Sequence, residues 1–131
     1  MEINELIAIA FKAIENAYIP YSKFGVGACV ELNDGTTIKG CNIENAAYGS
    51  TMCAERNAVY ATYCQGYKKE DIKSLTIVAD ATPLISPCGA CRQVLAELLK
   101  EDTPIILANK KEHRVTNIKE LLPYSFTGEA L

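Results

Sequence analysis

Residues 25–42 read GVGACVELNDGTTIKGCN, and this stretch indicates a β-hairpin. Two strand-like runs, 25–32 and 36–42, lie on either side of Asn33-Asp34-Gly35. An Asp-Gly pair between two such runs is a strong short-range hairpin signal. We therefore expect two antiparallel strands joined at this turn.

The segments outside the hairpin alternate between helical and strand-like patterns. Residues 75–79 (LTIVA) and 104–108 (PIILA) predict buried strands, and a short strand and helix are expected at the end of the chain. Before the hairpin, apolar side chains recur at steps of three and four, which predicts an amphipathic helix: Ile3, Leu6, Ile7, Ala10, Phe11 and Ile14. Strands separated by helices behind a hairpin predict an α/β protein with a mixed sheet covered by helices.

Two further helices are expected after the hairpin. The first covers about residues 51–64, and its packing face consists of small residues: Ala54, Ala58 and Ala61. The second begins at Ser86-Pro87, with Ser86 as the N-cap and Pro87 in the first helical position.

The composition is that of one ordinary globular domain, which we expect to span residues 1–131. Hydrophobic residues make up 49% and charged residues 22%, which excludes a mainly disordered chain. No apolar run approaches the roughly 20 residues that span a bilayer, and the first residues lack a secretory signal. We therefore expect a cytoplasmic protein without a membrane partner. A net charge of −3 argues against nucleic acid as a partner.

Six cysteines are many for a protein of a reducing compartment, and they favour metal binding or catalysis over disulfides. Cys88 and Cys91 form a CxxC motif at an expected helix start, where the i, i+3 spacing puts both sulfurs on one side of the first turn. The helix N-terminus favours their thiolate forms. Taken alone, this motif leaves zinc binding and thiol redox chemistry open.

A third thiolate is expected from Cys53, in the sequence TMCAER at the start of another helix. Three protein ligands leave the fourth tetrahedral position of a zinc ion open, as in catalytic sites. Glu55 would then be an unligated carboxylate near that position. Because positions i and i+2 do not face the same way on a regular helix, we expect Cys53 to lie in the first turn, so that its sulfur and the Glu55 carboxylate both reach past the helix end.

The remaining candidate ligands receive no chemical role. Cys29, Cys41 and Cys64 are expected to be buried and inert. His113 lies in a charged turn, and we do not expect it to bind the metal.

The C-x-E and P-C-x-x-C motifs, about 35 residues apart, match the zinc deaminase pattern. YSKFGVGA, GCNIENAAYG, CAER, SPCGACRQVL and ELLPYSF also occur in order, so nearly the whole chain resembles the small homotetrameric cytidine deaminases with a three-cysteine zinc site. The chain departs from that family at Cys29, where alanine is frequent, and at Asn57, where threonine is usual. The resemblance implies a three-layer α/β/α fold around a mixed five-stranded sheet.

The resemblance also implies an activity: hydrolytic deamination of cytidine and 2'-deoxycytidine to uridine and 2'-deoxyuridine plus ammonia, in pyrimidine salvage. One zinc ion per chain would be held by Cys53, Cys88 and Cys91. A zinc-bound hydroxide would attack C4 of the base while Glu55 carries protons. Arg56 would hydrogen-bond to the ligand sulfurs and offset their charge.

The substrate-binding residues implied by the resemblance are Phe24, Asn42, Glu44, Ala46, Tyr48, Ala54 and Phe126. Three of them, Ala46, Tyr48 and Phe126, would reach the nucleoside from neighbouring subunits of a homotetramer.

Other functions remain open at this point. A structural zinc module would need a fourth protein ligand and would have no use for Glu55. A thiol redox protein would use Cys88 and Cys91 without a metal. A blasticidin-type deaminase shares the zinc motifs, but the segment GCNIENAAY favours cytidine as the substrate.

Overall fold

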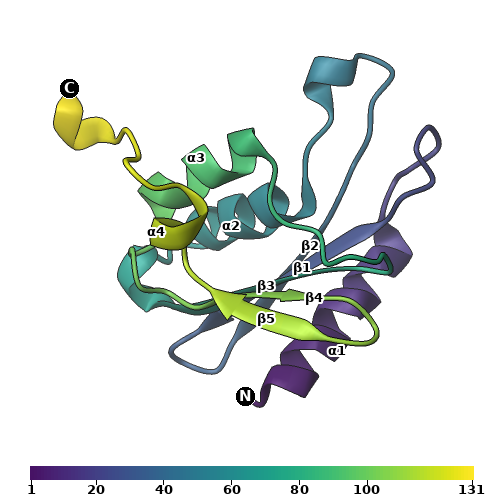
Figure 1. Cartoon of the computed structure of the whole chain (residues 1–131), viewed down its shortest axis with the longest axis horizontal. Coiled ribbons are helices and arrows are strands. Elements are labelled where there is room, and N and C mark those ends of the chain that lie inside the picture. The colour runs from purple at the N-terminus through teal and green to yellow at the C-terminus, as the bar shows by residue number, and fades with distance from the viewer.

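The sheet predicted from the sequence is present and has five strands. The computed structural model describes residues 1–131, apart from the side chain of Ala130. The strands are β1 (Val26–Leu32), β2 (Thr37–Cys41), β3 (Ile72–Ala79), β4 (Ile105–Ala108) and β5 (His113–Thr116). Their order is β2-β1-β3-β4-β5; β3 and β4 run parallel, and each other neighbouring pair is antiparallel (Figure 1).

The predicted hairpin is formed by β1 and β2. The backbone N–H of Leu32 donates to the carbonyl of Thr36 at 2.9 Å, which closes the turn. Gly35 has a φ of +91°, a conformation that glycine adopts without the steric penalty of a side chain.

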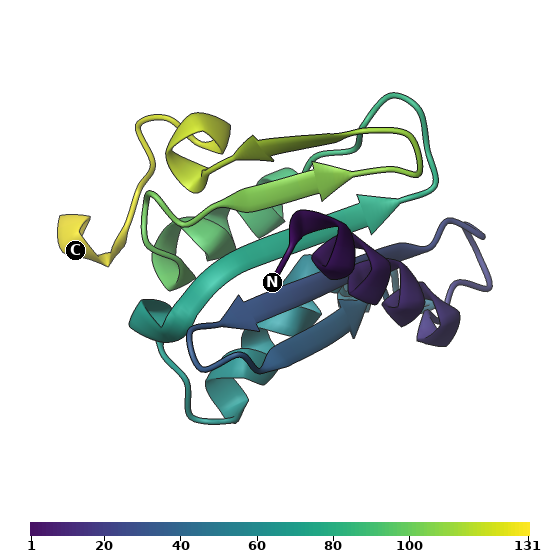
Figure 2. The same ribbon diagram turned by 90° about the horizontal axis from the view of Figure 1, so that it is seen from below.

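Helices cover both faces of the sheet. The α-helices are α1 (Ile3–Ala13), α2 (Ala54–Cys64), α3 (Gly89–Leu98) and α4 (Ile118–Leu121), and the 3-10 turns are η1 (Ile14–Asn16), η2 (Tyr48–Ser50), η3 (Lys69–Asp71) and η4 (Gly128–Ala130). Helix α1 crosses one face of the sheet, whereas α2 and α3 lie on the other (Figures 1 and 2). The expected three-layer α/β/α fold is therefore confirmed. None of the helices described here combines the length and apolar character needed to cross a membrane.

Each helix layer has its own apolar core. Leu6 and Ala10 of α1 pack against Val78, Ile106 and neighbouring side chains of the sheet. On the opposite face, α2, α3 and the residue after α3 contribute to a larger cluster: Ala54, Ala58, Val59, Leu95 and Leu99, packed on Val30, Leu75 and Ile105. The layer formed by α2 and α3 positions the candidate site.

Helix α2 lies unusually close to the edge strand β2, because Gly40 has no side chain. A Cβ atom at Gly40 would lie 2.5 Å from the carbonyl oxygen of Ala54 and 2.6 Å from the backbone nitrogen of Ala58. The N-terminal turns of α2 therefore rest directly on the backbone of β2.

Two helix starts and two cysteines differ from the expectations. Helix α2 begins at Ala54 rather than near residue 51, and α3 begins at Gly89 with Cys88 as its N-cap. Ser86 lies before the N-cap position and does not cap α3; its hydroxyl accepts a hydrogen bond from the Arg92 guanidinium. Cys29 is buried as expected. The expectation was wrong for Cys41 and Cys64: Cys41 is half-buried at the end of the edge strand β2, and Cys64 is exposed at the C-terminal end of α2.

Candidate metal centre

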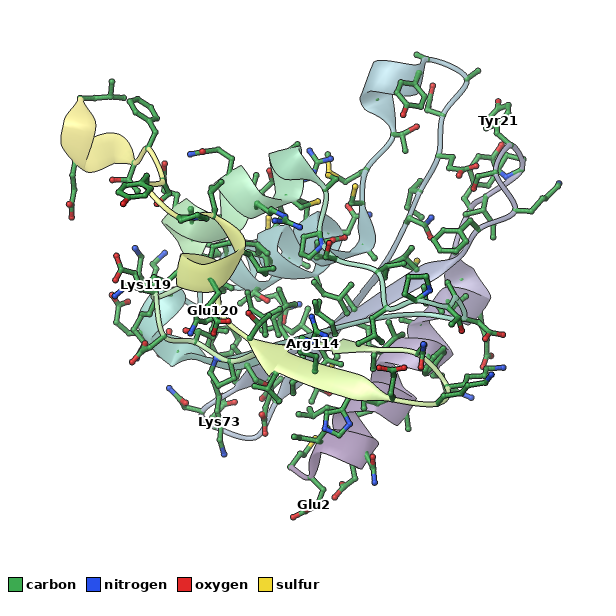
Figure 3. The ribbon with its side chains drawn as sticks, viewed as in Figure 1. Glu2, Tyr21, Lys73, Arg114, Lys119 and Glu120 are labelled. Atoms are coloured by element: carbon green, nitrogen blue, oxygen red, sulfur yellow. The ribbon has the colours of Figure 1, made fainter. Side chains whose placement is uncertain are left out.

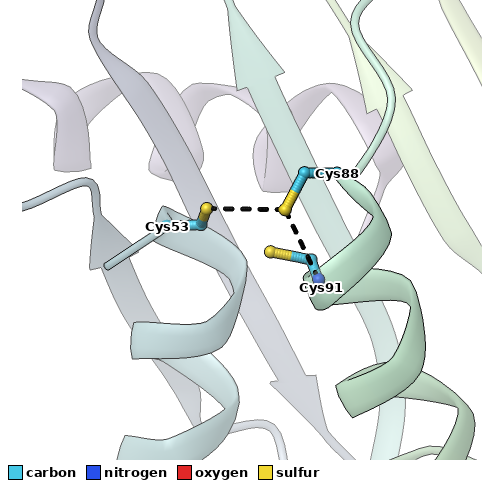
Figure 4. A group of neighbouring side chains, drawn as sticks. All are labelled: Cys53, Cys88 and Cys91. Carbon is cyan, nitrogen blue, oxygen red and sulfur yellow. Dashed lines mark hydrogen bonds between the residues drawn. The ribbon is translucent and has the colours of Figure 1, made fainter. Parts of the chain in front are cut away.

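The N-terminal ends of α2 and α3 bring three cysteines together (Figure 4). Cys53 and Cys88 are the N-cap residues of the two helices, and both have extended backbone conformations. Their Sγ atoms lie 3.8 Å apart, and the Cys88 sulfur accepts the backbone N–H of Cys91 at 3.4 Å. The three sulfur atoms all lie within 4.8 Å of one another.

This arrangement of sulfurs fits a zinc ion. Zinc binds thiolate sulfur at about 2.3 Å in tetrahedral geometry, which places two ligand sulfurs about 3.8 Å apart. The Cys53–Cys88 separation of 3.8 Å matches that spacing. Soft thiolate donors suit zinc rather than magnesium or calcium. Three protein donors leave one tetrahedral position for water or substrate.

Hydrogen bonds around the sulfurs favour a thiolate at Cys53. A hydrogen bond from the Cys91 thiol, assisted by the Arg56 guanidinium, outweighs burial and lowers the pKa of Cys53 to about 5. The Arg56 Nη2 donates to the Cys53 sulfur at 3.4 Å. The same interaction with Cys53, together with burial, raises the pKa of Cys91. Arg56 thus contacts the sulfur of one of the three clustered cysteines.

Glu55 is a buried carboxyl group beside these thiols. It is 4% exposed and belongs to the first turn of α2. Burial raises its pKa, and the negative charge of Cys53 adds to that increase. A carboxyl group with a raised pKa is suited to both accepting and donating a proton near neutral pH.

The helix start also resolves how Cys53 and Glu55 can act together. Cys53 precedes the helix and has φ −74° and ψ 153°, so the helical spacing rule does not apply to it. Cys53 and Glu55 both line one cavity. The expectation that Cys53 lies in the first turn was wrong, because Cys53 is the N-cap residue and precedes the first turn of α2.

That cavity has a volume of about 250 Å³ and opens beside the metal centre. Three of the expected substrate residues line it, namely Phe24, Asn42 and Ala54. The other lining residues are Val26, Thr51, Met52, Cys53, Glu55, Ile85, Ser86 and Cys88. The apolar walls and few polar groups are typical of a site for a small molecule.

The other expected substrate residues lie outside this cavity. Glu44, Ala46 and Tyr48 line a second hollow of about 450 Å³, and Thr51 borders both. Tyr48 is 90% exposed. Phe126 lies on the C-terminal segment and is 57% exposed, and its carbonyl accepts a hydrogen bond from Gln93 at 2.8 Å.

Two residues that hold the site in place were not identified from the sequence. Asn57 donates its side-chain amide to the carbonyl of Cys41 at 2.8 Å and so ties α2 to the end of β2. Arg92 donates to the carbonyls of Pro87 and Leu121 and thereby fixes the loop before Cys88. The position of Arg92 directly after the CxxC motif was the only local signal for its role.

The chain matches a family model and several known proteins over most of its length. Residues 1–107 match the cytidine and deoxycytidylate deaminase zinc-binding region. The chain is 46% identical over 130 residues to the cytidine deaminase of Halalkalibacterium halodurans, covering 98% of this chain and 97% of that protein. It is 47% identical to the cytidine deaminase of Sporosarcina psychrophila, covering 100% and 96%. The crystal structure of cytidine deaminase from Burkholderia pseudomallei superposes with a TM-score of 0.93 at 43% identity, covering 96% of this chain and 100% of that one.

Proposed function

Because the chain belongs to the cytidine and deoxycytidylate deaminase family, we propose that Cys53, Cys88 and Cys91 hold its zinc ion and that Glu55 carries its protons. The chain catalyses the hydrolytic deamination of cytidine to uridine and ammonia. We take 2'-deoxycytidine as a second substrate and residues 1–131 as one catalytic domain. The observation that carries the assignment of roles is the buried Glu55 carboxyl beside three clustered thiols.

When bound, zinc lowers the pKa of a water molecule and so supplies a nucleophile at neutral pH. Glu55 accepts the proton that this water loses. It then delivers the proton to N3 of the cytosine ring and later carries one to the departing amino group. Its raised pKa suits both transfers. Cytidine and one water are thereby converted to uridine and ammonia.

Asn42 and Phe24 are suited to hold the nucleoside. The Asn42 side-chain oxygen accepts the Val26 N–H at 2.9 Å, and its amide donates to the Phe24 carbonyl at 2.8 Å. One N–H and one lone pair of Asn42 therefore remain for a sugar hydroxyl. The Phe24 side chain provides an apolar wall, and the Ala54 N–H is among the first four of α2, which lack a partner within the helix.

The exposed aromatic residues support a homo-oligomer, which we assign as a tetramer. Tyr48 and Phe126 are 90% and 57% exposed, although burying large aromatic side chains is favourable. In such an assembly, Ala46, Tyr48 and Phe126 would complete the site of a neighbouring subunit. We also infer a cytoplasmic location, because a cluster of three free cysteines suits a compartment that keeps thiols reduced.

An assay of cytidine absorbance, with zinc analysis of the same reduced preparation, tests this function. Glu55→Gln should retain one zinc per chain and lose about 10²–10⁴-fold in kcat, because it removes a positioned proton carrier. Glu101→Gln, which changes an exposed carboxylate after α3, is the matched control. A Glu55→Gln enzyme within tenfold of the wild-type kcat would show that another group carries the proton.

A further inference from the structure

The Ser22 hydroxyl connects two of the residues assigned to substrate binding. Ser22 lies in the loop between η1 and β1, two residues before Phe24. The backbone N–H of Phe24 donates to Ser22 Oγ at 3.0 Å, and the Ser22 hydroxyl donates to Glu44 Oε2. The Phe24 carbonyl is held separately by Asn42. The backbone of Phe24 is therefore fixed on one side through Ser22 and on the other by Asn42.

Glu44 has little acceptor capacity left for a ligand. Its Oε1 accepts the backbone N–H groups of Tyr21 and Ser22, both at 3.1 Å. A carboxylate offers about four lone-pair sites, and three of them are used here. The remaining site is on Oε2, the oxygen that the Ser22 hydroxyl also contacts. The direction in which Glu44 can accept a sugar hydroxyl therefore depends on Ser22.

The loop around Ser22 needs such support, because its backbone is strained. Lys23 has a φ of +60°, in the left-handed region that residues with a side chain rarely adopt. The loop extends away from the sheet, with Tyr21 near its outer end (Figure 3). A strained conformation persists only where surrounding contacts impose it. The bonds from this loop to Glu44 are contacts of that kind.

We propose that Ser22 is a positioning residue for nucleoside binding, whose hydroxyl orients the Glu44 carboxylate and the Phe24 backbone together. This inference rests on the proposed function, in which Phe24 contacts the nucleoside, and it takes Glu44 as a further nucleoside ligand, as the family resemblance implies. The role requires a side chain that accepts one hydrogen bond and donates another. Threonine meets this requirement and alanine does not.

Steady-state kinetics with cytidine and calorimetric binding of uridine to the zinc-loaded enzyme test the proposal. Ser22→Ala should raise KM for cytidine and Kd for uridine in parallel, by roughly tenfold, with kcat within about twofold, because it weakens binding rather than chemistry. Ser22→Thr should restore both constants. Thr36→Ala is the matched control, since it removes a hydroxyl from the exposed turn between β1 and β2.

A double-mutant cycle identifies the route of the effect. In a Glu44→Ala background, Ser22→Ala should raise KM by a smaller factor than in the wild-type enzyme, because the contact with Glu44 is already gone and only the bond from the Phe24 N–H is lost. Additive effects, an unchanged KM in Ser22→Ala, or equal defects in Ser22→Ala and Ser22→Thr would each overturn the proposal. A wild-type enzyme that holds zinc but does not deaminate cytidine would instead contradict the proposed function.

Discussion

Replacing Gly40 by alanine should disturb the metal centre without touching any ligand. The new Cβ would lie 2.5 Å from the Ala54 carbonyl oxygen, whereas ordinary contacts of this kind begin at 3.4 Å. Relieving the clash requires a movement of about 0.9 Å. The atoms in the way belong to the backbone of α2, so the whole first turn must move rather than one flexible side chain. Cys53 directly precedes that turn.

The size of the effect follows from this displacement. Overpacking typically costs about 1–3 kcal/mol, and the reduced entropy of the unfolded chain returns about 0.4–1 kcal/mol. We expect a net loss of about 1.3 kcal/mol in unfolding free energy, which lowers Tm by about 5 °C in a domain of this size. Ligand distances at a metal site are tolerated within about 0.2 Å, so a 0.9 Å shift should also weaken zinc binding.

Gly27→Ala provides the matched control for this experiment. A Cβ at Gly27 would lie 1.9 Å from the carbonyl oxygen of Ala10, on the face covered by α1. It should destabilise the protein at least as much but leave the zinc affinity of the folded fraction near the wild-type value. Thermal unfolding and competition with a chromogenic chelator measure the two quantities. A Gly40→Ala protein with wild-type zinc affinity would refute the proposed link between this contact and Cys53.

Three further outcomes are expected. Cys88→Ala should abolish stoichiometric zinc binding and lower Tm, because the ligands join two helices; zinc retained at one per chain would contradict its assignment as a ligand. Arg56→Gln should keep one zinc per chain but move the low-pH limb of kcat/KM to higher pH, because losing a positive charge beside the thiolates disfavours deprotonation of the water that the metal activates. An unshifted pH profile would limit Arg56 to a packing role. Light scattering should give an assembly of four chains of 14.3 kDa each, and a fully active monomer would exclude the shared site.

The fold could be predicted wherever its signals are local. The Asp-Gly turn and the apolar runs of β3 and β4 identified the core of the sheet, because strand and turn patterns extend over only a few residues. The start of α3 was misplaced for a local reason as well. Ser86-Pro87 has the composition of a helix start, but the Ser86 hydroxyl is engaged by Arg92, and Cys88 caps the helix with its sulfur.

The contacts that support the site could not be predicted, because they join distant segments. Ser22 reaches Glu44 across 22 positions, Asn57 reaches Cys41 across 16, and Arg92 reaches Leu121 across 29. No periodicity encodes such pairs. The three cysteines were found because each belongs to a short motif at a helix start, and their assembly required only that two helix ends meet.

Cysteine at the N-cap of α2 serves the site but leaves this helix less stable than a conventional N-cap residue would. The side-chain oxygen of an N-cap serine or aspartate would accept one of the first backbone N–H groups of the helix, which have no partner within it. This bond would stabilise the helix by about 1 kcal/mol. Cys53 occupies that position without any side-chain capping bond, whereas the Cys88 sulfur does accept the N–H of Cys91. The start of α2 must therefore be held by other means. The close backbone contact at Gly40 and the amide of Asn57 supply this support, and a metal held by Cys53 would add to it. A substitution at Gly40 should therefore displace Cys53 before the other residues of the site, because the start of α2 has no side-chain cap.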